Sequence, residues 1–420
     1  LILVVMTFAF FIRSGPITLS GLDERVEQNT MNQIQQIVTQ QVNQQYPNLG
    51  QVYRQEEVNK RMEEIRQTGE LQVQGQTINI EDTIDRNTEQ VKSSFKAENG
   101  QTYLNAIDPY LFYGYAENYL ENGHPGTELK EGSNGEERPF VSYRTAPNGK
   151  FVGDNFHIWL LGNTMNLFGV SVDDPVGEKT RSIFLIPVIF AMLAVIPIFF
   201  ILRHFTNDIY ATMGSLLLMS VGTFVSRTVA GFVDTDAYNV FFPLTITAIL
   251  VYGYLYRNYL MTVALAALAG VFQGLFIWAW GPGWFIFVFL VGALLGYLGY
   301  IVLQELINSR SLQDVAKAFQ SEPIVNSAIN SGVFVFSSYL FTYLIKGSNI
   351  FMSAYQGILG SFERIATISE SYIWPNVLSS VAELNPASFN QMMGTVGGAV
   401  VFFLAFLGLL FLSLDFKRTS

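Results

Sequence analysis

Four carboxylates stand in short polar or aromatic stretches that border long apolar runs. Asp234 and Asp236 occur in GFVDTDAYN, Asp108 occurs in NAIDPYLFYGYAENYLENGHPG, and Glu370 occurs in ATISESYIWP. Carboxylate oxygens are the ligands that Mg²⁺ and Mn²⁺ prefer, and an Asp-x-Asp pair on a tight loop can aim two of them at one ion. Such an ion can neutralise a phosphate or pyrophosphate leaving group. The pattern therefore favours a divalent metal site that serves a phosphorylated substrate.

Each of these residues also has a purely structural interpretation. Asp108 precedes a proline and could cap the helix that follows, and Asp236 could cap the span that begins directly after it. Arg227, upstream of the aspartate pair, could orient a carboxylate or meet a phosphate, but it could also anchor the chain at the membrane interface. Glu370 could be a solvated loop charge.

The three histidines add little to the metal hypothesis. His124 and His157 match no metal motif in their spacing, and His204 lies at the end of an apolar run. We therefore expect a structural role for each of them.

The composition is that of a membrane protein. Half of the 420 residues are hydrophobic and only 14% are charged, whereas a soluble domain carries about 25% charged residues. A helix needs about 20 apolar residues to cross the hydrocarbon core. The chain has several charge-free runs of about that length or longer, namely 183–202, 209–226, 237–256, 258–304, 323–345 and 394–414. The run 258–304 is long enough for two spans, with a break expected at Gly281-Pro282-Gly283.

The segment before these spans is polar. Residues 1–13 hold about half an apolar span, which we interpret as a first transmembrane helix whose N-terminal part has been cut off. Residues 14–100 are rich in Gln, Asn and Glu with some apolar residues at helical spacing, which indicates a helical polar insert; a flexible insert is the alternative. Residues 101–181 read as an ordered loop with short helices. The net charge of the chain is −10, and most of it comes from the residues before 181. This negative charge argues against nucleic acid as a partner.

Alternation of the spans predicts which segments share a face. If the first helix runs outward, residues 14–181 lie outside, residues 182–345 form a transmembrane bundle with an external turn at 231–239, and 346–393 form another external loop. Residues 394–420 then return to the cytoplasm. The short internal loops carry Arg or Lys, as the positive-inside rule requires. Asp108, the aspartate pair and Glu370 therefore share the extracytoplasmic face of a multi-pass protein of the cell membrane.

Three stretches resemble the catalytic subunit of oligosaccharyltransferases, most of all its archaeal form. SRTVAGFVDTDAYN is similar to the second acidic motif of that family, IDPYLFYGYAENYLENGHPG is similar to the first, and TISE at 367–370 matches the Thr-Ile-x-Glu motif. The three occur in the family order, and the likeness covers about residues 101–414. It does not account for residues 14–100.

The resemblance implies a polytopic α-helical fold of the GT-C type and N-linked protein glycosylation. The family transfers a glycan from a dolichol or other polyprenyl phosphate or pyrophosphate to Asn in Asn-x-Ser/Thr of an acceptor protein. By this likeness Asp108, Asp234 and Asp236 would hold Mn²⁺ or Mg²⁺, Arg227 would support the site, and Glu370 would contact the acceptor amide. An amide nitrogen is a poor nucleophile, so a carboxylate that accepts its N–H bonds would help to activate it.

The sequence departs from the family in two places. Ala106 stands where the first motif usually has an acidic residue, and no WWDYG-like sequence occurs. We therefore expect a truncated chain that lacks the acceptor-reading domain.

Two other classes remain open. Another GT-C enzyme, such as a protein O-mannosyltransferase, would have no amide for Glu370 to activate. A transporter or non-catalytic membrane scaffold would place its carboxylates at the midplane of the bilayer rather than in loops on one side.

Overall fold

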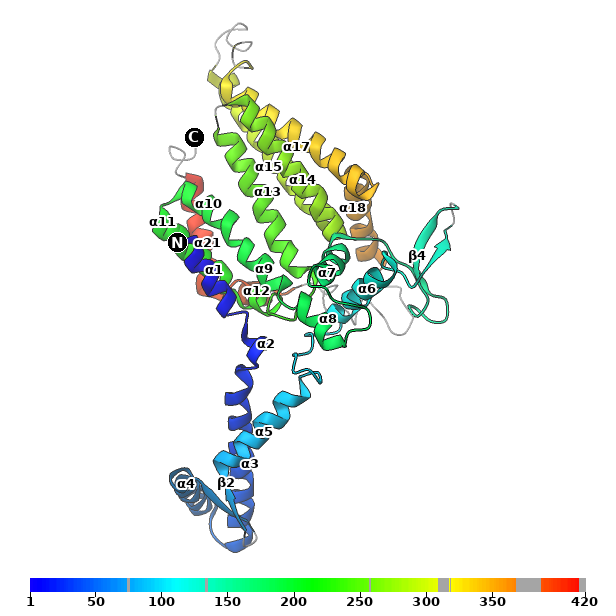
Figure 1. Ribbon diagram of the computed structural model, residues 1–420. Coiled ribbons are helices and arrows are strands. Elements are labelled where there is room, and N and C mark those ends of the chain that lie inside the picture. Colours follow the sequence, from blue (N-terminus) through cyan, green and yellow to red (C-terminus); the bar gives the residue numbers. More distant parts are fainter. Residues whose placement is uncertain are drawn as a thin grey trace.

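The computed structural model describes residues 1–73, 76–132, 135–256, 258–308, 317, 319–367 and 387–414. A bundle of apolar helices forms the main body, a long polar arm projects from one end of it, and a small α/β unit lies beside the base of the arm (Figure 1). We call the end of the bundle that carries the arm the arm side.

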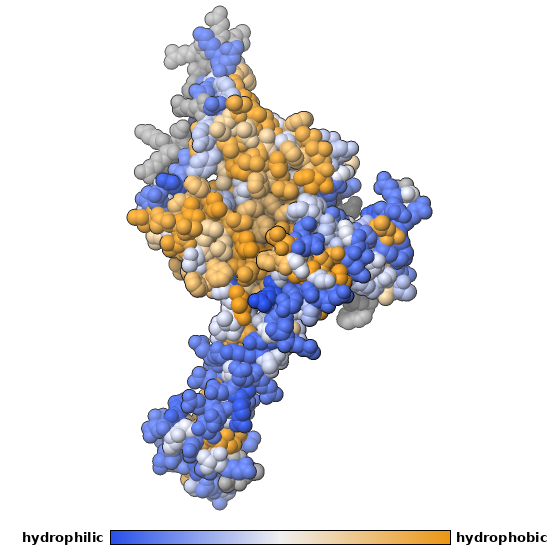
Figure 2. Space-filling view, in the orientation of Figure 1, coloured by the Kyte–Doolittle hydropathy of each residue, from blue (hydrophilic) through white to orange (hydrophobic). Residues whose placement is uncertain are grey.

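The bundle contains the apolar helices expected from the charge-free runs. Five helices of the described residues are long and apolar enough to cross a membrane, or up to seven if each of two bent pairs forms one span. On the face shown in Figure 2, the surface of the bundle is largely apolar, whereas the arm is largely hydrophilic. The predicted α-helical polytopic membrane fold is therefore confirmed. Its helices are α1 (Ile2–Phe11), α8 (Val176–Ile183), α9 (Ile186–Leu193), α10 (Val195–Phe205), α11 (Asp208–Met219), α12 (Gly222–Ser226), α13 (Tyr238–Leu255), α14 (Tyr259–Ala279), α15 (Trp284–Asn308), α17 (Glu322–Lys346), α18 (Ile350–Thr367), α20 (Phe389–Thr395) and α21 (Ala399–Leu414).

Two breaks in the apolar runs differ in how well the sequence predicted them. The break at Gly281-Pro282-Gly283 is confirmed, because these residues form the short 3₁₀ helix η2 between α14 and α15. The run 209–226, expected to be one span, is instead divided into α11 and the short α12. With 12 residues, α11 is about 18 Å long, shorter than the hydrocarbon core of about 30 Å.

Helices α14 and α17 pack closely because small residues face each other. Gly270 and Gly274 lie one helical turn apart on α14, and a Cβ atom added at Gly270 would stand 2.0 Å from the Ser337 Oγ and 2.6 Å from the Ser338 backbone nitrogen. Small residues at this spacing let helix backbones approach each other in membranes. A buried aromatic core around Phe242, Phe276 and Phe334 continues the contact.

This packing makes Gly270→Leu a severe substitution. Overpacking a close contact costs about 1–3 kcal/mol or more, and here the contact involves backbone as well as side chain, so we expect a loss of roughly 3 kcal/mol. Thermal unfolding in detergent measures the effect. Gly292→Leu on α15 is the matched control, since a Cβ atom there meets nothing within 4 Å. Equal unfolding midpoints for the two variants would contradict the packing described.

The arm consists of packed helices and a β-hairpin. On α3 (Gly21–Gln45) the buried residues recur every four positions, so they form one face of the helix. This face packs against buried residues of α4 (Gln51–Thr68), the β-hairpin and α5 (Ile80–Ser94). The short α2 (Gly15–Thr18) joins the arm to α1, and β1 (Glu70–Val73) pairs with β2 (Gln76–Asn79) in an antiparallel hairpin. The domain boundaries drawn from the sequence remain a prediction.

The α/β unit follows the arm in the chain and lies beside the arm side of the bundle (Figure 1). The helices α6 (Asp108–Asn122) and α7 (Phe156–Leu167) pack together, and an antiparallel sheet joins them in the order β3-β4-β5. Its strands are β3 (Glu128–Glu131), β4 (Glu137–Val141) and β5 (Lys150–Phe151). In the register, Phe140 of β4 lies opposite Phe151 of β5. The first residue of α6 is Asp108, so this unit carries the first acidic motif.

Candidate functional site

Two loops that are far apart in sequence are joined at the arm side of the bundle. The Asn105 backbone N–H donates to the Gly231 carbonyl at 2.9 Å, and the Asn105 side-chain amide donates to the Ala230 carbonyl at 3.1 Å. The Gly231 N–H in turn donates to the Phe184 carbonyl at 2.8 Å. Gly231 adopts a φ of 84°, in the left-handed region that favours glycine. The loop before α6 and the turn before α13 are thereby held together.

These bonds place Asp108 and Asp234 close enough to repel each other. Burial raises the pKa of Asp234, and the charge of Asp108 raises it further, while the hydrogen bond from the Thr235 N–H and the charge of Arg227 oppose the increase. The Asp108 side chain is exposed, and no hydrogen bond or ion pair engages it within the described residues. Ala106, two residues before it, has a φ of 73°, a strained value for a residue with a Cβ atom.

The backbone conformation shows which aspartate caps a helix. Asp234 precedes the 3₁₀ helix η1 (Thr235–Ala237), and its carboxylate accepts a hydrogen bond from the Thr235 N–H at 2.6 Å. Asp236 lies inside η1 and is not the cap of the span that follows. Asp108 makes no side-chain cap hydrogen bond to α6. The capping alternatives for Asp108 and Asp236 are therefore wrong.

Arg227 lies on the same surface as the aspartate pair. Its Nη1 stands 3.5 Å from an Asp236 carboxylate oxygen, and its guanidinium lies over the Phe232 ring at 5.4 Å. Both side chains of the ion pair are partly exposed, so the pair contributes little to stability. The ion pair instead orients the two side chains: Arg227 points toward the acidic turn, and the Asp236 carboxylate points toward Arg227.

A buried histidine, His157, contacts the acidic turn at Val233 and Tyr238. His157 is fully buried, and burial lowers its pKa to about 4, so the ring is neutral at pH 7. Its Nε2 lies 3.4 Å from the Val233 carbonyl, and its Nδ1 lies 2.7 Å from the Tyr238 hydroxyl. A carbonyl only accepts, so Nε2–H donates to Val233 and Nδ1 accepts from Tyr238. His157 therefore has the structural role expected of it. Its ring links Val233 and Tyr238, the two ends of the acidic turn.

Arg13 is a further support that the sequence reasoning missed. It is fully buried at the end of α1, its Nε donates to the Thr228 hydroxyl at 2.7 Å, and its backbone carbonyl accepts from the Ala230 N–H at 2.9 Å. The guanidinium also lies 4.7 Å from the centre of the Phe224 ring. The only sequence signal was an arginine directly after an apolar run, which also fits an interfacial anchor.

The donor set suits a hard divalent cation, although a complete metal site is not visible. No group of three or more His, Cys, Asp or Glu side chains in the described part of the chain is arranged to hold a metal ion. Asp108 and Asp234 supply carboxylate oxygens whose mutual repulsion a cation would relieve. Asp236 faces Arg227 instead, and Glu370 lies outside the described residues. The two aspartates are therefore the part of the predicted set that the structure brings together.

Comparison with known proteins identifies relatives along most of the chain. Residues 80–418 match the family model described as oligosaccharyl transferase STT3, N-terminal. A dolichyl-phosphooligosaccharide-protein glycotransferase of Methanococcus voltae is 28% identical over 347 residues, which cover 78% of this chain and 36% of the relative. The enzyme of the same name from Methanocaldococcus jannaschii is 25% identical over 426 residues, which cover 83% of this chain and 45% of the relative. The chain thus spans less than half the length of these two curated relatives.

Solved structures of an archaeal oligosaccharyltransferase are also similar. The Archaeoglobus fulgidus enzyme in complex with Zn and sulfate has 17% sequence identity and a TM-score of 0.41, over 74% of this chain and 36% of that one. AglB of the same organism, in complex with an inhibitory peptide and a dolichol-phosphate, has 18% identity and a TM-score of 0.41, over 76% and 35%. The family model begins at residue 80, so most of the arm lies outside the matched region.

Proposed function

The chain belongs to the STT3 oligosaccharyl transferase family, and from this membership we propose that it forms the membrane part of an enzyme that transfers a lipid-linked glycan to asparagine. The observation that supports the proposal is the junction of Asn105 with Gly231, which holds the loop of Asp108 next to the turn of Asp234. The names of the curated relatives support a dolichyl-phosphate or related carrier as donor. A structure of the Archaeoglobus fulgidus enzyme tethered to a peptide with an NVT sequon supports an Asn-x-Ser/Thr acceptor.

The residues of the site have separable tasks in this proposal. Asp108 and Asp234, with Asp236 as a further ligand, would hold Mn²⁺ or Mg²⁺, which would stabilise the departing phosphate or pyrophosphate. In this proposal Asp236 exchanges its 3.5 Å contact with Arg227 for the cation. Arg227 would then be free to meet a phosphate oxygen.

Acceptor activation falls to Glu370 in this proposal. Its carboxylate would accept an N–H bond of the asparagine amide and so weaken the delocalisation that makes this nitrogen a poor nucleophile. The site would lie on the extracytoplasmic face of the cell membrane, where the predicted topology places all four carboxylates.

A transfer assay with the full-length protein tests this proposal. The protein is incubated with a lipid-linked oligosaccharide and a fluorescent peptide that contains Asn-x-Thr, and the shift of the peptide on a gel is measured. We expect transfer to the asparagine peptide and none to a Gln-x-Thr peptide of otherwise identical sequence. EDTA should abolish the transfer, because no cation then stabilises the departing phosphate, and added Mn²⁺ should restore it.

Two results would refute the proposal. Transfer to a peptide whose only acceptor is a Ser or Thr hydroxyl would favour an O-glycosyltransferase. Transfer that persists unchanged in EDTA would remove the metal from the mechanism.

A further inference from the structure

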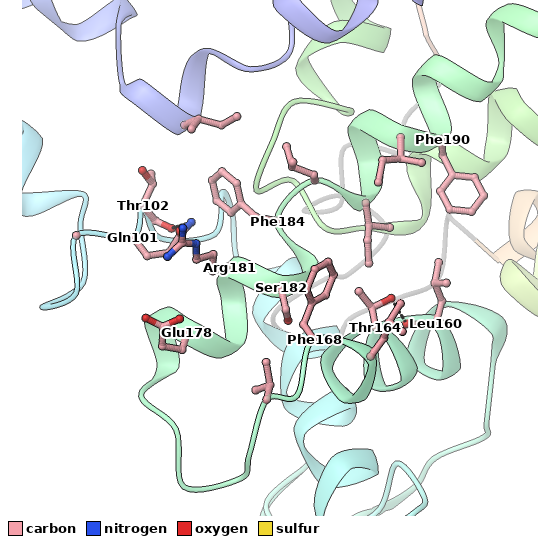
Figure 3. Close-up of a pocket in the computed structure, with 17 residues that line it drawn as sticks. Gln101, Thr102, Leu160, Thr164, Phe168, Glu178, Arg181, Ser182, Phe184 and Phe190 are labelled. Atoms are coloured by element: carbon pink, nitrogen blue, oxygen red, sulfur yellow. Dashed lines mark hydrogen bonds between the residues drawn. The ribbon is translucent and has the colours of Figure 1, made fainter.

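A groove next to the acidic turn is not used by the proposed reaction. It has a volume of about 740 Å³ and runs between α2, α7 and the segment that joins α8 to α9 (Figure 3). This volume falls in the range of about 300–1,000 Å³ that is typical of small-molecule sites. Most of the lining is apolar, with Leu160, Phe168, Ile189 and Phe190 among the lining side chains.

The groove has a polar end and an apolar end. In Figure 3 Gln101, Thr102, Glu178 and Arg181 lie at one end, and Leu160 and Phe190 lie at the other. Arg181 and Phe190 both belong to the candidate membrane span 176–205. They are nine positions apart, which corresponds to about 13 Å if the segment between α8 and α9 keeps a helical rise. A membrane crossed by this candidate span would have its arm-side surface near the polar end, and the apolar end would lie deeper in the hydrocarbon.

The rim of the groove exposes large apolar side chains. Leu167 and Phe168, at the C-terminal end of α7, are 82% and 68% exposed, and both line the groove. Ile17 of α2 and Ile189 of α9 also line it and are exposed. Adjacent apolar residues with this exposure mark a surface that meets lipid or a partner. Since they continue the apolar surface of a membrane span, the groove opens toward the bilayer.

Arg181 supplies an unpaired positive charge at the polar end. No ion pair engages its guanidinium within the described residues. Glu178, one helical turn earlier, instead accepts a hydrogen bond from the Asn99 side chain at 3.2 Å. A guanidinium at membrane level is the usual partner of a phosphate group. An apolar channel that ends at such a cation complements a phosphate attached to a hydrocarbon chain.

We propose that this groove binds one phospholipid of the surrounding bilayer. The phosphate contacts Arg181, and an acyl chain lies along Leu160, Ile189 and Phe190. The groove adjoins the acidic turn through Phe184 without including Asp108 or Asp234 in its lining, and in this proposal its lipid is a resident component of the protein and not the glycan donor.

The position of Phe184 gives the lipid a structural effect on the acidic turn. Phe184 lines the groove, and its carbonyl accepts the hydrogen bond from the Gly231 N–H. Its ring is close enough that a Cβ atom added at Gly231 would stand 2.6 Å from it. A lipid in the groove would therefore pack against a residue that contacts the turn before Asp234.

Lipid binding can be measured directly by native mass spectrometry of the full-length protein in detergent. The probes are dioleoyl-phosphatidylglycerol, dioleoylglycerol with the same acyl chains but no phosphate, and inorganic phosphate. We expect one phosphatidylglycerol adduct on the wild-type protein and an affinity about tenfold lower in Arg181→Gln, because a charge-assisted contact is lost. Arg203→Gln is the matched control: Arg203 lies at the other end of the same span and pairs with Asp208.

Other outcomes of the same titration would overturn the proposal. Equal binding of dioleoylglycerol, or an unchanged affinity in Arg181→Gln, would show that no phosphate is recognised. Displacement by inorganic phosphate at the same concentration as lipid would indicate a simple anion site. Displacement by an equimolar polyprenyl phosphate would assign the groove to the glycan donor.

A second measurement tests the coupling to the turn. In delipidated detergent, added phosphatidylglycerol should increase the rate of peptide glycosylation several-fold for the wild-type protein but not for Arg181→Gln. This readout rests on the proposed function, whereas the mass measurement does not. A protein that binds the lipid but shows no transfer at all would disprove the proposed function alone, and stimulation of Arg181→Gln equal to that of wild type would disprove the coupling.

Discussion

Asp234→Asn is expected to lower the rate of glycan transfer by about 10²–10³-fold, the loss that follows removal of one preorganised electrostatic group from an active site. Burial removes water from the Asp234 carboxylate, and the charge of Asp108 acts on it. A bound cation would compensate for both effects. Asparagine keeps the size and one acceptor oxygen, so the hydrogen bond from the Thr235 N–H is retained. Transfer to an Asn-x-Thr peptide by the full-length protein, over a range of Mn²⁺ concentrations, measures the change.

A matched control separates the role of the site from a general effect of removing a charge. Asp208 lies in the first turn of α11 and pairs with Arg203 at 2.7 Å, away from the acidic turn. Asp208→Asn should therefore transfer glycan at close to the wild-type rate. Both variants should show the wild-type unfolding temperature within a few degrees. If Asp234→Asn retained wild-type turnover at limiting Mn²⁺, Asp234 would not be a metal ligand.

The sequence predicts well those features that depend on local chemistry. The long charge-free runs indicate membrane helices because a span of apolar residues suffices for insertion. The Gly-Pro-Gly break between α14 and α15 follows from residues that end helices wherever they occur. The family resemblance, carried by short motifs around Asp108 and Asp234, is likewise readable without a structure, and the family match over residues 80–418 confirms it.

The supports of the site could not be predicted because they depend on contacts between distant segments. Asn105 and Ala230 are 125 positions apart, and nothing in either local sequence indicates that they pair. Arg13 similarly bonds to Thr228, 215 positions away. The prediction that 209–226 forms one span was wrong, because hydrophobicity alone does not show that α11 ends at Met219.

Gly231→Ala is expected to reduce transfer about as strongly as Asp234→Asn, but by displacing the site instead of removing a ligand. Gly231 has a φ of 84°, and an L-residue in this region costs about 1–2 kcal/mol. The added Cβ atom would also stand 2.6 Å from the Phe184 ring. The turn would have to shift, and with it the two hydrogen bonds that join Gly231 to Asn105 and Phe184. Asp108 and Asp234 would then separate, so we expect weaker Mn²⁺ binding together with slower transfer.

Gly222→Ala provides the control for this substitution. Gly222 is the first residue of α12, nine positions before Gly231, and an added Cβ atom there meets nothing within 4 Å. It should leave both Mn²⁺ affinity and transfer rate near the wild-type values. The Mn²⁺ affinity, followed by the electron paramagnetic resonance signal of the free ion, distinguishes a displaced site from a slowed chemical step. A Gly231→Ala protein that bound Mn²⁺ as tightly as wild type would show that the junction with Asn105 does not set the spacing of the two carboxylates. The alignment of Asp108 with Asp234 would then have to come from the helices α6 and α13 alone.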